Sequence, residues 1–190
     1  MRVLGISGSL RRDSLNSALL RAAAERLPAG AELVEFEGLR EIPPYDADLE
    51  LAGTPEPVRE LREAIRGADA VLVATPEYNH SIPGVLKNAL DWASRPAGSS
   101  ALNGKPAAAI GASTGMFGAV WAQAETRKVL SALGGRVVEA ELPIGHAAEQ
   151  YEDGRLELAP QQSEQLEEIL AELLSAVEES AEFARERVAA

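Results

Sequence analysis

Five short, mainly apolar runs are spaced along the first 140 residues of the chain. They occupy residues 3–6, 32–36, 70–74, 107–111 and 136–140. Each run is only four or five residues long, and each is followed by glycine, proline or hydroxyl-rich sequence or by a polar stretch. Runs of this length predict buried β-strands rather than helices.

Between these runs, apolar residues recur at the spacing of an α-helix. The four helical stretches are residues 15–27, 57–66, 83–92 and 116–133. The first ends before Pro28 and Gly30 and the last before Gly134 and Gly135, which are typical helix stops. Pro57 suits a first-turn position.

Strands that alternate with helices predict parallel βαβ units with right-handed crossovers, which place helices on both faces of one sheet. We therefore expect an α/β fold: a doubly wound five-stranded parallel sheet of flavodoxin-like order. Ligands bind such sheets at the carboxyl ends of the strands. Residues 1–160 would form this single domain.

The tail, residues 161–190, predicts a C-terminal acidic amphipathic helix. One face is apolar and the other carries glutamates; the apolar positions are Leu166, Ile169, Leu170, Leu173, Leu174 and Val177. A membrane-surface helix would carry lysine and arginine on its polar face. We expect this helix to pack on the domain or on a partner subunit.

Composition narrows the function. The net charge is −12, no basic run exceeds two residues, and nucleic-acid binding is therefore not expected. The chain has no cysteine, and His80 and His146 lie far apart, so a metal site is not expected either. No apolar stretch could span a bilayer, and the start of the chain does not resemble a signal peptide, so we expect no membrane partner and a cytoplasmic location.

The loop after the first strand, residues 8–17, combines hydroxyl, amide and guanidinium donors with the start of a helix. Backbone N–H groups at a helix N-terminus favour a phosphate, and a nearby arginine adds a charge-assisted bond. The loop lacks the lysine of a P-loop and the glycine spacing of a dinucleotide fingerprint. The alternative, that Ser14 or Asn16 only caps the helix, is compatible with phosphate binding.

Two further loops would lie at the same edge of the sheet. Residues 75–84 contain two prolines and Tyr78, whose flat face suits an aromatic ring, and residues 111–118 form a wall of small residues. The three loops together suit a flat, phosphorylated ligand such as FMN. We interpret His80 as an exposed loop residue rather than a catalyst, and Asp91 and Trp92 as packing or subunit-contact residues.

Two long motifs resemble the NADPH-dependent FMN reductase family, which includes chromate- and quinone-reducing flavoproteins and some azoreductases. They are GSLR at residues 8–11 with Ser14 and Asn16, and PEYNHSIPG at residues 76–84 with LKNALDW at 86–92. The resemblance covers about residues 2–141. It implies noncovalent FMN, homodimers or homotetramers with the flavin near the interface, and Arg127 close to that interface.

The resemblance also assigns cofactor-binding roles. The phosphate contacts would be Ser9, Arg11, Ser14, Asn16 and Ser17. The ring edge and ribityl chain would be held by Pro76, Glu77, Tyr78 and Asn79, with Ser113 and Gly115 on the other side.

We therefore expect an oxidoreductase in which NADPH or NADH reduces bound FMN and a small acceptor is reduced in turn. The acceptor could be a quinone, chromate, an azo compound or free flavin. Because the cofactor carries the chemistry, we name no catalytic residue. The alternatives are a non-enzymatic flavodoxin-like electron carrier, for which an aromatic content of 4% is low, and an FMN-binding redox sensor.

Overall fold

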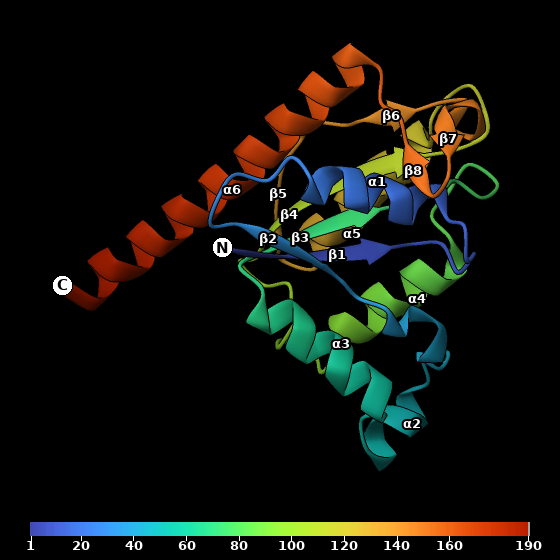
Figure 1. Cartoon of the computed structure of the whole chain (residues 1–190). Coiled ribbons are helices and arrows are strands. Elements are labelled where there is room, and N and C mark those ends of the chain that lie inside the picture. The colour runs from blue at the N-terminus through green and yellow to red at the C-terminus, as the bar shows by residue number, and fades with distance from the viewer. Residues whose placement is uncertain (190) are drawn as a thin grey trace.

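The structure, a computed structural model, describes the backbone of residues 1–189 and the side chains of residues 1–182. Its centre is a parallel sheet in the order β2-β1-β3-β4-β5, which confirms the expected flavodoxin-like arrangement (Figure 1). The strands are β1 (Arg2–Ser7), β2 (Glu32–Glu35), β3 (Ala70–Ala74), β4 (Pro106–Ala112) and β5 (Arg136–Val137).

Within residues 1–189, six α-helices and two short 3-10 helices connect or cover these strands. They are α1 (Leu15–Ala24), α2 (Ala47–Ala52), α3 (Glu56–Gly67), α4 (Gly84–Ala93), α5 (Val120–Ala132), α6 (Pro160–Ala189), η1 (Gly38–Glu41) and η2 (Ala147–Gln150). In the described part of the chain, none of the helices combines the length and the apolar character needed to cross a membrane.

Side chains of alternate residues in the central strands pack into two separate cores, one on each face of the sheet. On β3, Leu72 faces the core that α1 and α6 cover, whereas Val71 and Val73 face the core that α3 and α4 cover. All three side chains are fully buried. A strand buried on both faces reads as a continuous apolar run, which is why residues 70–74 are the clearest strand in the sequence.

The C-terminal helix closes the first core. Leu166, Ile169, Leu170 and Leu173 are almost completely buried against the sheet and α1. The helix then continues past the edge of the sheet, as Figure 1 shows. The first four turns of α6 therefore pack on the sheet and on α1 of the same chain. The division into residues 1–160 and 161–190 stays a prediction.

Several element boundaries differ from the predicted ones. The last strand, predicted over residues 136–140, pairs with β4 only at Arg136 and Val137. The carboxyl end of β4 pairs instead with a further strand, β6 (Pro143–Ile144). The helix predicted to begin at residue 116 begins at Val120, because residues 113–119 form a loop. A small hairpin, β7 (Tyr151–Glu152) with β8 (Arg155–Leu156), and α2 were not predicted.

Candidate functional site

A cleft of about 100 Å³ lies at the carboxyl ends of β1, β3 and β4. Its lining comes from the three loops that the sequence singled out. The lining residues are Ser9, Arg11, Ser14, Leu15, Asn16, Pro76, Glu77, Tyr78, Ala112, Ser113 and Thr114. This edge is the ligand-binding edge of a doubly wound sheet, so the fold and the sequence motifs agree on the place.

The first wall of the cleft is the N-terminus of α1. Ser14 caps this helix, and its Oγ accepts the backbone N–H groups of Asn16 and Ser17, each at 3.2 Å. No acidic residue of α1 occupies its first turn, where one would offset the positive end of the helix dipole. Among the hydrogen bonds of the described residues, none uses the hydroxyl hydrogen of Ser14 or the N–H of Leu15, so both could donate to an anion.

Arg11 adds a formal positive charge to this wall. Its side chain is exposed, and it takes part in none of the salt bridges formed by the described residues. Its backbone N–H donates to Ser9 Oγ at 3.3 Å, which folds the loop back on itself. A helix N-terminus beside an arginine can hold an anion such as a phosphate group.

Asn16 is bound to the neighbouring strand rather than aimed at the cleft. Its Nδ2 donates to the carbonyl of Ala112 at 2.9 Å, and its Oδ1 accepts the N–H of Ala112 at 3.0 Å. The side chain is 2% exposed. The amide therefore holds α1 against the end of β4, which fixes the distance between two walls of the cleft. Ser17 does not line the cleft, because its hydroxyl donates to Glu35 on β2 at 2.7 Å.

The second wall is a tight turn after β3. Tyr78 and Ser81 exchange backbone hydrogen bonds of 3.0 and 3.1 Å, and the two residues between them, Asn79 and His80, have φ angles of 53° and 61°. Two consecutive positive φ values are the mark of a type I′ turn, which Asn and His tolerate better than most residues. The turn leaves Tyr78 half exposed at the rim of the cleft, whereas Asn79 does not line it.

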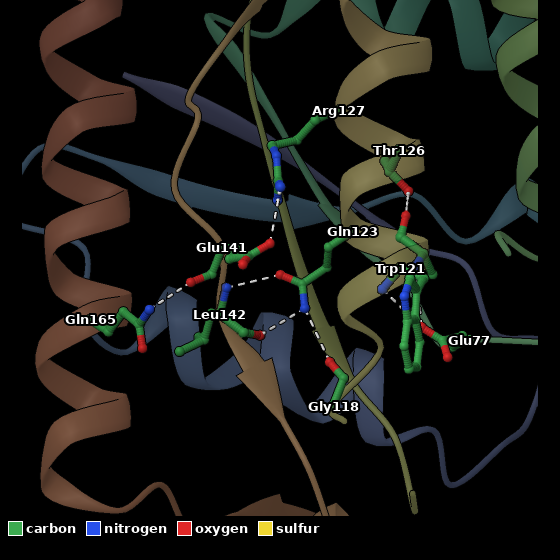
Figure 2. A network of polar contacts seen from close by, with 10 residues as sticks. Glu77, Gly118, Trp121, Gln123, Thr126, Arg127, Glu141, Leu142 and Gln165 are labelled. Atoms are coloured by element: carbon green, nitrogen blue, oxygen red, sulfur yellow. Dashed lines mark hydrogen bonds and ion pairs between the residues drawn. The ribbon is translucent and has the colours of Figure 1, made fainter. Parts of the chain in front are cut away.

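Glu77 fastens this turn to α5. Its Oε2 accepts the backbone N–H groups of Trp121 at 3.1 Å and Ala122 at 3.2 Å (Figure 2). The residue preceding α5, Ala119, has a left-handed backbone and no side-chain cap of its own. Glu77 therefore caps a helix that follows it by more than forty residues, and Ser81 Oγ adds a second tie by donating to Glu125 at 2.7 Å.

The third wall, residues 111–118, is fixed by backbone hydrogen bonds to the segment that follows it in the fold, residues 143–146. Ser113 donates its N–H to Ile144 at 3.0 Å, and Gly115 accepts the N–H of His146 at 3.1 Å. At Gly118 the backbone has a φ of 58°, and a Cβ there would lie 2.4 Å from the carbonyl carbon of Pro143. Only glycine fits so close a crossing of two backbones. Ser113 lines the cleft, whereas Gly115 lies just outside it.

Gln123 is a structural contributor that the sequence analysis missed. Its fully buried amide donates to the carbonyls of Gly118 and Leu142 at 3.1 Å each and accepts the N–H of Leu142 at 2.8 Å (Figure 2). It thereby joins the third wall to the segment between β5 and β6. A lone glutamine within a helix gave no signal in the sequence, because the same residue type is common on solvated faces.

Arg127 forms a contact within its own chain. Its Nη2 lies 3.0 Å from Glu141 Oε2, and the arginine side chain is 14% exposed. Glu141 in turn accepts a hydrogen bond at its backbone carbonyl from Gln165 of α6. Figure 2 shows the resulting chain of contacts from α5 to α6. The predicted place of Arg127 near a subunit interface stays a prediction.

A second cleft, of about 210 Å³, lies between α1 and the β7–β8 hairpin. Arg21, Arg26 and Arg155 line it, but each is already engaged. Arg21 donates to the carbonyl of Gly154 at 2.9 Å, Arg26 to Ser163 Oγ at 2.9 Å, and Arg155 to Glu25 at 2.7 Å. These bonds hold the hairpin and α6 to α1, so the arginines act structurally.

Known proteins resemble this chain over most of its length. The sequence model of the NADPH-dependent FMN reductase family matches residues 1–149. An NAD(P)H-dependent FMN reductase of Pseudomonas aeruginosa is 52% identical over 130 residues, which are 68% of this chain and 69% of that protein. A 2-hydroxy-1,4-benzoquinone reductase of a Burkholderia species is 44% identical over 133 residues, 70% of this chain and 72% of that one.

A solved structure shows the same relationship in three dimensions. The flavoenzyme NAD(P)H:(acceptor) oxidoreductase of Paracoccus denitrificans superimposes with a TM-score of 0.81 at 36% identity, covering 94% of this chain and 98% of that one. At 94% coverage the agreement extends beyond residue 149 and reaches into α6.

Proposed function

Because this chain belongs to the NADPH-dependent FMN reductase family, we propose that it binds FMN phosphate at the N-terminus of α1 and passes electrons to a quinone. It is an NAD(P)H-dependent flavin oxidoreductase. We propose, in addition, the residue assignments, the acceptor, the assembly and the location in the cell. The observation that carries the proposal is that the N-terminus of α1 and Arg11 line one cleft.

The cleft fits the phosphate end of FMN. Its volume of about 100 Å³ suits a phosphate with part of the chain attached to it rather than a whole flavin, so the ring system would extend over the rim. Ser9, Arg11, Ser14 and the N–H of Leu15 would bind the phosphate. When bound there, FMN would supply the two-electron chemistry that links NAD(P)H to the acceptor.

The other walls would position the ring. Pro76 and Tyr78 come from the tight turn, and Ser113 comes from the small-residue wall, whose low bulk allows a planar group to approach the backbone closely. Asn79 and Gly115, at the ends of these walls, would contact parts of the cofactor beyond the cleft. Asn16, Ser17 and Glu77 would act by holding the walls, since their side-chain polar atoms bond to protein.

A quinone is the acceptor that the relatives favour, because several of those with 40% identity or more are named for quinone reduction. Chromate, azo compounds and free flavin are the other candidates. A homodimer or homotetramer in the cytoplasm completes the proposal. Family resemblance supports the assembly, which sedimentation would measure, and the location agrees with the cytoplasmic supply of NADH and NADPH.

The test of the reaction is steady-state kinetics with both substrates varied. If nicotinamide and quinone use the same open side of the cleft in turn, double-reciprocal plots will show parallel lines. Intersecting lines would mean that both substrates bind at once and would remove the shared site. A pure electron carrier, the main alternative, would show no sustained oxidation of NADPH with a quinone present.

A further inference from the structure

Three aromatic side chains form a contiguous exposed cluster beside the cleft, which we call the aromatic rim: His80, Phe117 and Trp121. The ring centroids of His80 and Trp121 lie 4.8 Å apart at 86°, and those of Phe117 and Trp121 lie 4.9 Å apart at 63°. Phe117 is 54% exposed and Trp121 41% exposed, whereas the other tryptophan, Trp92, is fully buried.

The aromatic rim is continuous with the walls of the cleft. His80 follows the cleft residue Tyr78 by two positions in the same tight turn, and Phe117 follows the cleft residue Thr114 by three. Trp121 is fixed at its backbone by the cleft residue Glu77. The position of the rim is therefore set by the same contacts that shape the cleft.

Edge-to-face packing among the rim residues leaves ring surface open to a further aromatic group. Such contacts contribute about 0.5–1.5 kcal/mol beyond the area that they bury. An exposed apolar cluster beside a polar cleft is typical of a binding surface. The occupant that this surface suits is a flat, apolar ring system.

The charges around the rim disfavour an anion. The N-terminus of α5, which would otherwise attract one, is already occupied by the carboxylate of Glu77. That side chain is 12% exposed, so solvent screens it less than a surface carboxylate. Glu125, bound to Ser81, adds a second carboxylate nearby. An anionic acceptor such as chromate or ferricyanide would therefore gain no stabilisation at the rim.

We propose that the aromatic rim binds the fused rings of a neutral quinone and that Trp121 sets the preference for this acceptor class. The inference rests on the proposed function and names the substrate class of the same site. In the reaction the quinone gains two electrons and two protons and becomes a hydroquinone. NAD(P)H supplies a hydride through the bound flavin, and solvent supplies the second proton.

The first experiment uses the FMN-loaded protein without NAD(P)H, so no turnover occurs. A naphthoquinone without ionisable groups, 2-methyl-1,4-naphthoquinone, is titrated while tryptophan emission is recorded. Trp121 is the exposed tryptophan, and Trp121→Phe reports the emission of Trp92 alone. We expect saturable quenching in the wild-type protein that is absent from Trp121→Phe. Equal quenching of both proteins would overturn the proposal, because the quinone would then not contact the rim.

The second experiment compares acceptors. We expect Trp121→Ala to raise KM for the naphthoquinone about tenfold, the factor that corresponds to the upper end of an aromatic contact. Turnover with ferricyanide should change less than about twofold, and Trp121→Phe should restore most of the naphthoquinone affinity. Leu51→Ala, at an 86% exposed leucine of α2 outside the rim and the cleft, is the matched control and should leave both acceptors unaffected.

Two results would contradict the rim as a quinone site. One is an equal loss with both acceptors in Trp121→Ala. The other is a change in sedimented mass, which would show that a second copy of the chain covers the rim. Failure of the proposed function looks different: the FMN-loaded wild-type protein would not be reduced by NADPH. The quenching titration still decides on the rim in that case, because it needs no turnover.

Discussion

The carboxylate of Glu77 holds the backbone of Trp121: Oε2 accepts the Trp121 N–H at 3.1 Å, at the first turn of α5. One oxygen thus joins the second wall of the cleft to the helix that follows the third wall. The sequence resemblance assigns Glu77 to the flavin, whereas the structure gives its carboxylate a partner inside the protein. This difference can be measured.

We expect Glu77→Ala to destabilise the flavin-free protein by about 0.5–2 kcal/mol, the cost of removing a helix cap. Affinity for FMN should fall as well, because the wall that contains Pro76 and Tyr78 loses its anchor. Glu77→Gln keeps an acceptor oxygen and should lose less of both. Urea unfolding and a fluorescence titration with FMN measure the two effects. Unchanged unfolding together with lost FMN binding would instead make Glu77 a direct contact.

Asn16→Ala should destabilise the fold. The substitution leaves the buried N–H and carbonyl of Ala112 without their amide partner, at a cost of about 1–3 kcal/mol for each unsatisfied group. The sequence resemblance, by contrast, assigns Asn16 to the phosphate. Urea unfolding of the flavin-free protein measures the loss. If stability is retained and only FMN affinity falls, Asn16 binds the phosphate directly.

Arg11→Ala should leave the stability of the fold nearly unchanged and weaken the binding of FMN. The exposed guanidinium has no carboxylate partner in the salt bridges of the described residues, so unfolding should change by less than about 0.5 kcal/mol. FMN binding should weaken by about 1.5–3 kcal/mol, the contribution of a hydrogen bond to a charged group. Arg12→Ala, on the same loop but outside the cleft lining, is the matched control. Equal losses in the two variants would indicate a general effect of charge and not a phosphate contact.

The sequence predicted the sheet and the location of the cleft because both depend on local signals. Strands such as β3 are buried on both faces and are read as apolar runs, and the loop motifs follow the strands directly. Of the predicted cofactor residues, Ser9, Arg11, Ser14, Asn16, Pro76, Glu77, Tyr78 and Ser113 line the cleft.

The sequence could not predict the hydrogen bonds that polar side chains form with residues far away along the chain. The Glu77–Trp121 and Asn16–Ala112 bonds join residues 44 and 96 positions apart, and neither leaves a periodic signal. The shortness of β5 has a similar cause. Pairing with β4 passes from β5 to β6 along the same strand, and only the path of the chain in space decides where that exchange occurs.

The most direct test of the central claim is an anaerobic titration of the purified protein with NADPH, after its flavin has been released from a denatured sample and identified. Our account predicts FMN at about one per chain, a yellow colour that bleaches with about one equivalent of NADPH, and a return of the colour when a quinone is added. FAD in place of FMN, no flavin even after incubation with excess FMN, or a colour that NADPH and NADH leave unchanged would contradict it.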